Sequence, residues 1–143
     1  MGGQSAQATV AAHGWDVRNP IRHIADTDAY RRYIQESKAE FTVSKAGYAA
    51  TRSGWFGDRS AAYLASGRPV VTLDTGWPGA SGETGGLLTF RNVDEAVERI
   101  ADVNSRYAFH CREARRIAEE CFASHTVLAS LLEQASAAER PLR

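Results

Sequence analysis

The chain has 143 residues, of which 43% are hydrophobic and 24% charged, and its 17 Lys and Arg balance 17 Asp and Glu. This is the size and composition of one globular domain, which excludes a complete two-domain enzyme, a fibre and a disordered tail. A net charge of zero argues against a general nucleic-acid binder, because such binders need an excess of Lys and Arg on one face. A site for a small anion remains open.

Targeting and redox features indicate a cytoplasmic protein. The first twelve residues lack the basic segment and apolar core of a signal peptide, and no apolar run approaches the roughly 20 residues that cross a bilayer. Cys111 and Cys121 lie in a segment with a helical pattern, at a spacing that suits neither a compact metal site nor a disulfide. We therefore expect free thiols, a cytoplasmic location, no membrane partner and no nucleic-acid partner.

The first forty residues are weakly patterned. Small apolar residues at helical spacing predict a helix over 4–13, and the alternation of Trp15–Arg18 predicts a short strand that buries its tryptophan. Asp26 or Thr27 is a suitable N-cap for a helix that continues to Lys38.

The middle of the chain gives the clearest signals. Glu40–Ser44 is rich in β-branched and aromatic residues and predicts a strand, followed by a long loop over 45–58 and a helix over Arg59–Ser66. Pro69–Leu73 is a continuous apolar run, typical of a parallel strand that is covered on both faces. Leu87–Phe90 predicts a further short strand.

Three helices are predicted in the last third of the chain. Asn92 is the N-cap of the first, and Glu95 completes the spacing of a capping box. Tyr107–Phe122 and His125–Ala137 have helical patterns, the latter with an apolar stripe, and the tail 139–143 is expected to be frayed.

The order of these elements predicts an α/β fold. Strands that alternate with helices at these spacings form right-handed crossovers, so we expect a Rossmann-like, doubly wound parallel sheet of about four strands with C-terminal helices. Such sheets bind ligands beyond the carboxyl ends of their strands, and two glycine-rich loops directly follow predicted strands.

The first of these loops, Thr51–Ser60, leads into a helix. Its glycines let the backbone approach a ligand, and the amides of the first helical turn attract an anion. Arg52 or Arg59 can add charge-assisted hydrogen bonds, an arrangement that suits a diphosphate. In the alternative interpretation, Asp58 only caps the helix and Arg59 is a solvated residue of its first turn.

The second loop, Asp74–Gly86, has five glycines. It could close over a ligand, with Asp74 or Glu83 accepting hydrogen bonds from sugar hydroxyls, and Trp55 and Trp77 could stack on a base or a sugar. The alternative is a plain connector between strands.

The sequence lacks the motifs of metal sites, serine hydrolases, ATPases and dinucleotide-binding dehydrogenases. The four histidines have no metal-ligand spacing and are interpreted as surface or packed residues, and Gly-x-Ser-x-Gly, Walker A and Gly-x-Gly-x-x-Gly are absent. We therefore expect no metal and no cofactor.

The segment SKAGYAATRSGWFGDRSAAYLASGRPVV over 44–71, followed by TLDTGW and GETGGLLTF, resembles the C-terminal, nucleotide-sugar-binding domain of bacterial GT-B glycosyltransferases. The upstream DTDAYRRYIQESKAEFTVSK and the downstream NVDEAVERI are also similar to that group. The resemblance covers residues 14–133.

This resemblance implies that the first loop and the helix from Asp58 hold the diphosphate of the sugar donor, and that the second loop faces the sugar. The implied phosphate-binding residues are Arg52, Ser53, Gly54, Trp55, Asp58, Arg59 and Ser60. The residues implied near the sugar are Asp74, Thr75 and Gly76. Ala62 stands where the wider superfamily commonly has a ribose-binding glutamate, and no catalytic residue is assigned.

GT-B enzymes catalyse between two domains, and the resemblance covers only the second of them, apparently without its first strand. We therefore expect residues 1–143 to form one donor-binding domain, truncated or part of a split enzyme and inactive alone. Its expected partners are a nucleotide-sugar and either a second copy of the chain or an N-terminal-like subunit. The alternatives are a non-catalytic accessory or interaction protein with the same fold, and an unrelated small enzyme such as a phosphatase or an esterase.

Overall fold

The computed structural model describes residues 3–78 and 85–138, and the chain divides into two compact units, Met1–Tyr33 and Ile34–Arg143. The predicted frayed tail at 139–143 lies outside the described residues. The strand predicted at Trp15–Arg18 is wrong, because these residues have no regular structure and Trp15 is 59% exposed. Four alternating residues fit an extended loop as well as they fit a strand.

Two helices of the first unit, α2 (Pro20–His23) and α3 (Thr27–Glu36), begin at side-chain caps. Helix α1 spans Gly3–Ala12, and α3 crosses the boundary of the two units. Of the two predicted caps of α3, Asp26 is the one used, since its Oδ1 accepts a hydrogen bond from Ala29 N at 2.7 Å. The short α2 was not predicted.

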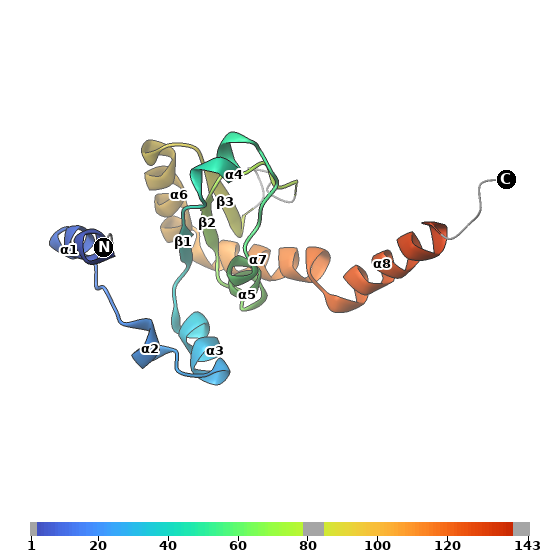
Figure 1. Ribbon diagram of the computed structural model, residues 1–143, viewed down its shortest axis with the longest axis horizontal. Helices are drawn as coiled ribbons and strands as arrows, with labels where there is room; N and C mark the ends of the chain where they lie inside the picture. Colours follow the sequence, from blue (N-terminus) through green and yellow to red (C-terminus); the bar gives the residue numbers. More distant parts are fainter. Residues whose placement is uncertain (1–2, 79–84, 139–143) are drawn as a thin grey trace. The chain divides into compact units, whose positions relative to one another are not determined.

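The second unit is built on a parallel sheet of three strands in the order β1-β2-β3 (Figure 1). The strands are β1 (Glu40–Thr42), β2 (Val70–Leu73) and β3 (Leu87–Phe90). Val71 of β2 is in register with a residue of each neighbouring strand. The α/β prediction is therefore confirmed at the level of a small parallel sheet. The described residues contain three strands where about four were expected, because the predicted strand near the N-terminus does not form.

Five helices accompany this sheet: α4 (Ala46–Ala50), α5 (Asp58–Ala65), α6 (Val93–Ser105), α7 (Tyr107–Cys121) and α8 (Ser124–Ala138). Four of them match predicted helices to within two residues at each predicted end. Helix α4 was not predicted. It lies within the first part of the long loop that was predicted over 45–58.

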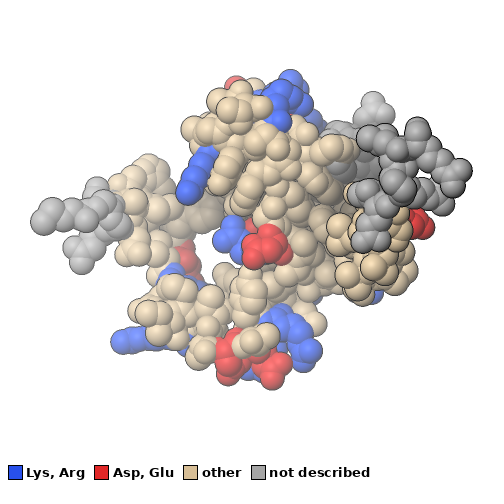
Figure 2. All heavy atoms as spheres, turned by 45° about the vertical axis from the view of Figure 1, so that its right-hand side comes forward, with Lys and Arg blue, Asp and Glu red and all other residues tan. Residues whose placement is uncertain are grey.

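Acidic and basic side chains are interspersed on the face that Figure 2 presents, as expected for balanced charge. None of the described helices is long and apolar enough to cross a membrane. The two cysteines are free thiols, Cys111 half-buried and Cys121 exposed, which confirms that part of the prediction.

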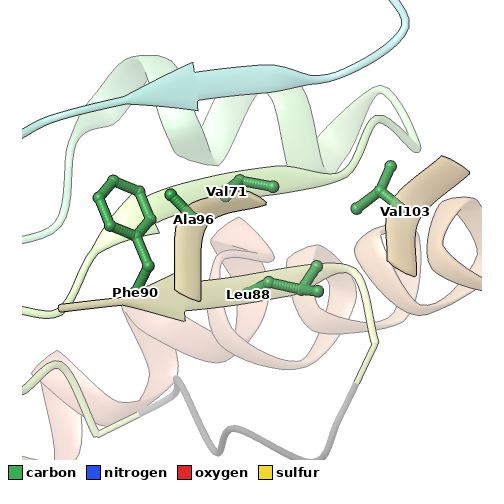
Figure 3. Packing of buried hydrophobic residues seen from close by; sticks show 5 residues of the cluster. All are labelled: Val71, Leu88, Phe90, Ala96 and Val103. Carbon is green, nitrogen blue, oxygen red and sulfur yellow. The ribbon is translucent and has the colours of Figure 1, made fainter. Parts of the chain in front are cut away.

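One cluster of the hydrophobic core lies between α6 and the sheet. Its buried members come from β2, β3 and α6 and are Val71, Leu88, Phe90, Ala96 and Val103 (Figure 3). Helix α6 covers this face of the sheet, and α5 and α7, which pack against each other, lie on the opposite face. Burial of these aliphatic and aromatic side chains holds β2 and β3 rigidly, so the loops at their carboxyl ends start from fixed points.

The turn before β3 is held by a buried histidine. Gly86 has φ +87°, and a Cβ atom there would lie 2.3 Å from Ala114 N. Gly86 N donates to Nδ1 of His110 at 3.1 Å, and Nε2 of this histidine lies 3.3 Å from Oδ2 of Asp102. The Arg106 guanidinium, bonded to the same carboxylate, holds the pKa of Asp102 below its usual range. The packed role expected for the histidines is confirmed for this one.

Candidate functional site

The first loop, Thr51–Ser60, begins at the C-terminus of α4, where one residue has an unusual backbone conformation. Ser53 N donates to Tyr48 O and Arg52 N donates to Ala49 O, both at 3.1 Å, which is the hydrogen-bond pattern of a Schellman motif. Arg52 holds the left-handed position of that motif with φ +46°, a conformation that favours glycine. A bulky residue kept in this conformation points to a role for its side chain.

The second loop is tied to the first by backbone and side-chain bonds. Gly54 N donates to Thr75 O at 2.9 Å, and Thr75 Oγ1, on a buried residue, donates to Trp55 O at 2.6 Å. Asp74 Oδ1 accepts from Gly76 N at 2.8 Å, which forms a local turn. Two segments twenty residues apart in the chain therefore meet at the carboxyl end of β2, as the sequence predicted for the two loops.

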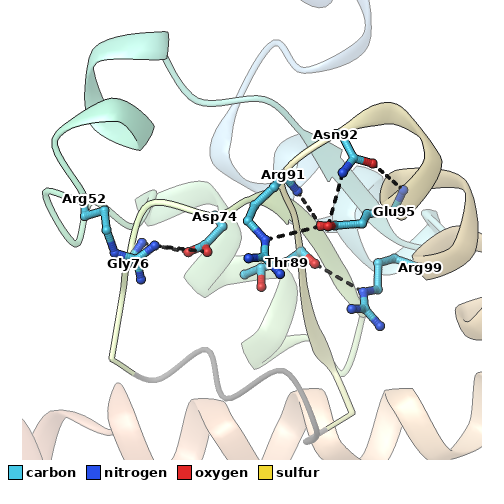
Figure 4. A network of polar contacts seen from close by, with 8 residues as sticks. All are labelled: Arg52, Asp74, Gly76, Thr89, Arg91, Asn92, Glu95 and Arg99. Carbon is cyan, nitrogen blue, oxygen red and sulfur yellow. Dashed lines mark hydrogen bonds and ion pairs between the residues drawn. The ribbon is translucent and has the colours of Figure 1, made fainter.

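A polar cavity of about 420 Å³ opens where these loops meet the end of β3 (Figure 4). Its lining residues are Arg52, Asp74, Gly76, Trp77, Pro78, Thr89, Arg91, Glu95 and Arg99. Arg52 Nη1 lies 3.4 Å from Asp74 Oδ2, with the arginine side chain 67% exposed. The cavity therefore holds Arg52, Asp74 and Gly76 of the predicted site residues.

The other side of the cavity is the start of α6. Asn92 caps this helix by accepting from Glu95 N at 2.9 Å, which confirms the predicted N-cap. The Glu95 carboxylate accepts from Arg91 N at 2.8 Å and from Asn92 Nδ2 at 3.2 Å. One turn further along, Arg99 Nε donates to the Thr89 carbonyl at 3.2 Å. The last of these bonds holds the Arg99 side chain at the rim of the cavity, and Arg91 Nε lies 3.6 Å from Glu95 Oε2.

Electrostatically, the cavity suits an anion. Three guanidinium groups face two carboxylates, Asp74 and Glu95, which leaves one positive charge in excess. Guanidinium groups bind phosphate and carboxylate oxygens through paired N–H donors. The described residues contain no group of three His, Cys, Asp or Glu side chains that could hold a metal ion.

Three further predicted residues lie at the start of α5, outside the lining of the cavity. The helix begins after Gly57, which provides no side-chain cap. Asp58 Oδ1 accepts from Arg59 N at 2.9 Å, and Ser60 is buried.

The guanidinium of Arg59 is bonded to the first strand of the sheet. Its Nε donates to Oε1 of the buried Glu40 at 2.5 Å and its Nη2 donates to Thr42 Oγ1 at 2.9 Å. Arg59 is therefore held against β1.

Aromatic residues of the loops stack on protein neighbours. The ring of Trp55 stacks on Tyr48, with centroids 5.2 Å apart. Trp77 stacks on Phe56 and Phe122, with centroids 4.5 and 5.7 Å away. Ser53 Oγ lies within hydrogen-bonding distance of Tyr48 O. These contacts hold both tryptophan rings against protein neighbours.

Sequence reasoning missed Arg91 and Arg99 and gave Glu95 only a capping role. Their signal is their position: the three residues follow a predicted strand at intervals of four, which places them on one face at the start of a helix. Glu83, predicted as a possible sugar ligand, lies outside the described residues.

Searches of protein families, of curated proteins and of solved structures find no match to the chain.

Proposed function

We propose that the chain binds a nucleoside diphosphate sugar in the cavity at the carboxyl ends of β2 and β3, as the donor-binding domain of a glycosyltransferase. The observation that carries this proposal is the set of three guanidinium groups, Arg52, Arg91 and Arg99, around a cavity of about 420 Å³. Small-molecule sites of parallel α/β sheets lie at this edge, and their volumes begin near 300 Å³.

In the proposed complex the diphosphate lies between the three arginines. The diphosphate gains negative charge as its bond to the sugar breaks. The guanidinium groups would therefore stabilise the leaving diphosphate during transfer. Asp74, which lies beside Arg52 and already accepts from Gly76 N, would accept hydrogen bonds from sugar hydroxyls. The resemblance of the loop sequences to GT-B donor domains supports the choice of a nucleotide-sugar over other anions.

The experiment is titration calorimetry of the full chain with pyrophosphate, UDP, dTDP and UDP- and dTDP-sugars. The expected result is binding that strengthens from pyrophosphate to nucleotide to nucleotide-sugar. Replacing Arg91 or Arg99 by Gln should weaken binding about tenfold to a hundredfold, the usual range for a lost charge-assisted hydrogen bond. Arg112→Gln, which changes an exposed arginine of α7, is the matched control and should leave the affinity unchanged.

Three results would contradict the proposal. Absence of binding at millimolar nucleotide would remove the donor site, and binding of pyrophosphate alone would leave an anion site without a nucleotide. Equal losses in Arg91→Gln and Arg112→Gln would show that the effect is one of overall charge.

A second candidate function is a non-catalytic interaction protein that retains this fold. It is favoured by the bonds that engage Arg59 with Glu40 and Thr42, because this arginine is then a structural residue. This candidate predicts that Arg52→Gln and Arg59→Gln leave nucleotide titrations unchanged, since there would be no binding to lose.

A further inference from the structure

A groove with apolar walls runs beside α6 and shares Arg91 at its edge with the polar cavity. It has a volume of about 380 Å³. We define the α6 groove by its five exposed apolar side chains, which come from β1, the residue after it and α6: Phe41, Val43, Val93, Val97 and Ile100. Between 41% and 77% of each of these residues is exposed. Such a continuous apolar surface is characteristic of an interface.

A second apolar surface lies on α8. The α8 stripe consists of Val127, Leu128, Leu131 and Leu132, which a helix of 3.6 residues per turn places on one face. All residues of α8 from 124 to 137 are exposed. Figure 1 shows this helix leaving the end of α7 and running away from the sheet.

We propose that the α8 stripe of one copy of this chain packs into the α6 groove of a second copy, and the reverse, in a closed two-fold dimer. The two surfaces are complementary in kind, because an apolar helix face is convex and the groove is concave. Both belong to the second unit and neither includes a residue of the polar cavity.

Area favours a reciprocal pair over a single contact. If each of the nine side chains buries on the order of 80 Å², one contact removes roughly 700 Å² from water, below the 1,200 to 2,000 Å² of stable interfaces. Two contacts related by a two-fold axis remove about 1,400 Å², which lies within that range. A closed pair also leaves neither surface exposed, whereas a head-to-tail chain leaves one at each end.

The first test is the mass of the full chain in solution, by light scattering or sedimentation. The wild-type chain should have twice the monomer mass. Val97→Glu in the groove and Leu128→Glu on the stripe should each give a monomer, because a carboxylate would be buried at the contact. These residues are 61% and 57% exposed, so the fold of one copy should tolerate both changes, which circular dichroism checks.

Ser130→Glu is the matched control. It adds the same charge to the same helix on the face away from the stripe, and it should leave the dimer intact.

A mixing experiment identifies which surfaces meet. Val97→Glu retains an intact stripe and Leu128→Glu retains an intact groove, so an equimolar mixture can form one of the two contacts. Because a single contact buries about half of the area, the mixture should associate only weakly, at concentrations well above those at which the wild type dimerises, while each variant alone stays monomeric at those concentrations.

Several results would overturn the proposal. A monomeric wild type would remove it, as would a ladder of larger species. A dimer that survives Val97→Glu would show that α8 pairs with α8, and one that survives Leu128→Glu would show that the groove pairs with itself. A mixture of the two variants that stays monomeric would also contradict it. All readouts are masses without ligand, so failure of nucleotide binding does not affect them.

Discussion

The backbone of Gly76 lies so close to Arg52 that a Cβ atom on the glycine would be 3.1 Å from Arg52 Cβ and 3.3 Å from Arg52 O. Gly76 also has φ +79°. Space and backbone conformation therefore both require glycine. This contact holds the second loop against the residue that contributes one guanidinium group to the cavity.

Gly76→Ala should lower the free energy of unfolding by about 1–3 kcal/mol, because the methyl group meets Arg52 and the residue keeps an unfavourable φ. It should also weaken nucleotide binding, since Arg52 must shift. Urea denaturation and calorimetry measure the two effects. Gly47→Ala is the control, because nothing lies within 4 Å of a Cβ atom there, and it should raise stability slightly through helix propensity. Equal stability of the two variants would contradict this prediction.

Gly86→Ala should be more damaging than Gly76→Ala. The new Cβ atom would lie 2.3 Å from Ala114 N, which is backbone of a packed helix and cannot move aside as a flexible side chain can. We expect a loss of about 3 kcal/mol or more, or failure to fold. Thermal denaturation measures it, and a melting temperature within a few degrees of the wild type would show that α7 moves freely against this turn.

The ion pair between Arg59 and Glu40 can be tested with a double-mutant cycle. Arg59→Ala should cost about 1–3 kcal/mol, because it leaves the buried Glu40 carboxylate without its cation. Glu40→Gln combined with Arg59→Ala should cost less than the two single changes added together, since the uncompensated charge is gone. Urea denaturation of the four proteins gives the coupling. Additive losses would show that the pair contributes no interaction energy.

Asp102 makes the stability of the fold depend on pH in the acidic range. Its pKa is held below the usual range of a carboxyl group, chiefly by the hydrogen bond from Arg106. A carboxyl group with a lower pKa in the folded state stabilises the fold above its unfolded pKa, and this contribution is lost as the pH falls through the folded pKa. Asp102→Asn should therefore be less stable than the wild type at pH 7, with a smaller difference near pH 3. A difference that stays constant between these pH values would contradict this.

Residues with local signals were predicted well. The apolar run of β2 and the Asn92–Glu95 cap of α6 depend on neighbours in the sequence, and the structure contains both. The predicted strand at Trp15–Arg18 failed because a strand needs a partner for its backbone groups, which four alternating residues do not specify. Helix α4 was missed because its five residues are too short for a helical period.

The candidate site was predicted in part for the same reason. Glycine-rich loops after strands identified Arg52 and Asp74, whose bonds are largely local to those loops. Arg91 and Arg99 belong to the cavity only because β3 lies beside β2, and no spacing within one segment encodes that neighbourhood. The bond of Arg59 to Glu40 joins residues nineteen apart and likewise depends on the tertiary fold.

Under the proposed function, the left-handed backbone of Arg52 sets fold stability against ligand binding at this position. Glycine there would relieve the strained conformation and at the same time delete the guanidinium group. A library of all substitutions at this position, sorted once for heat resistance and once for retention of a fluorescent nucleotide, should enrich glycine in the first sort and arginine in the second.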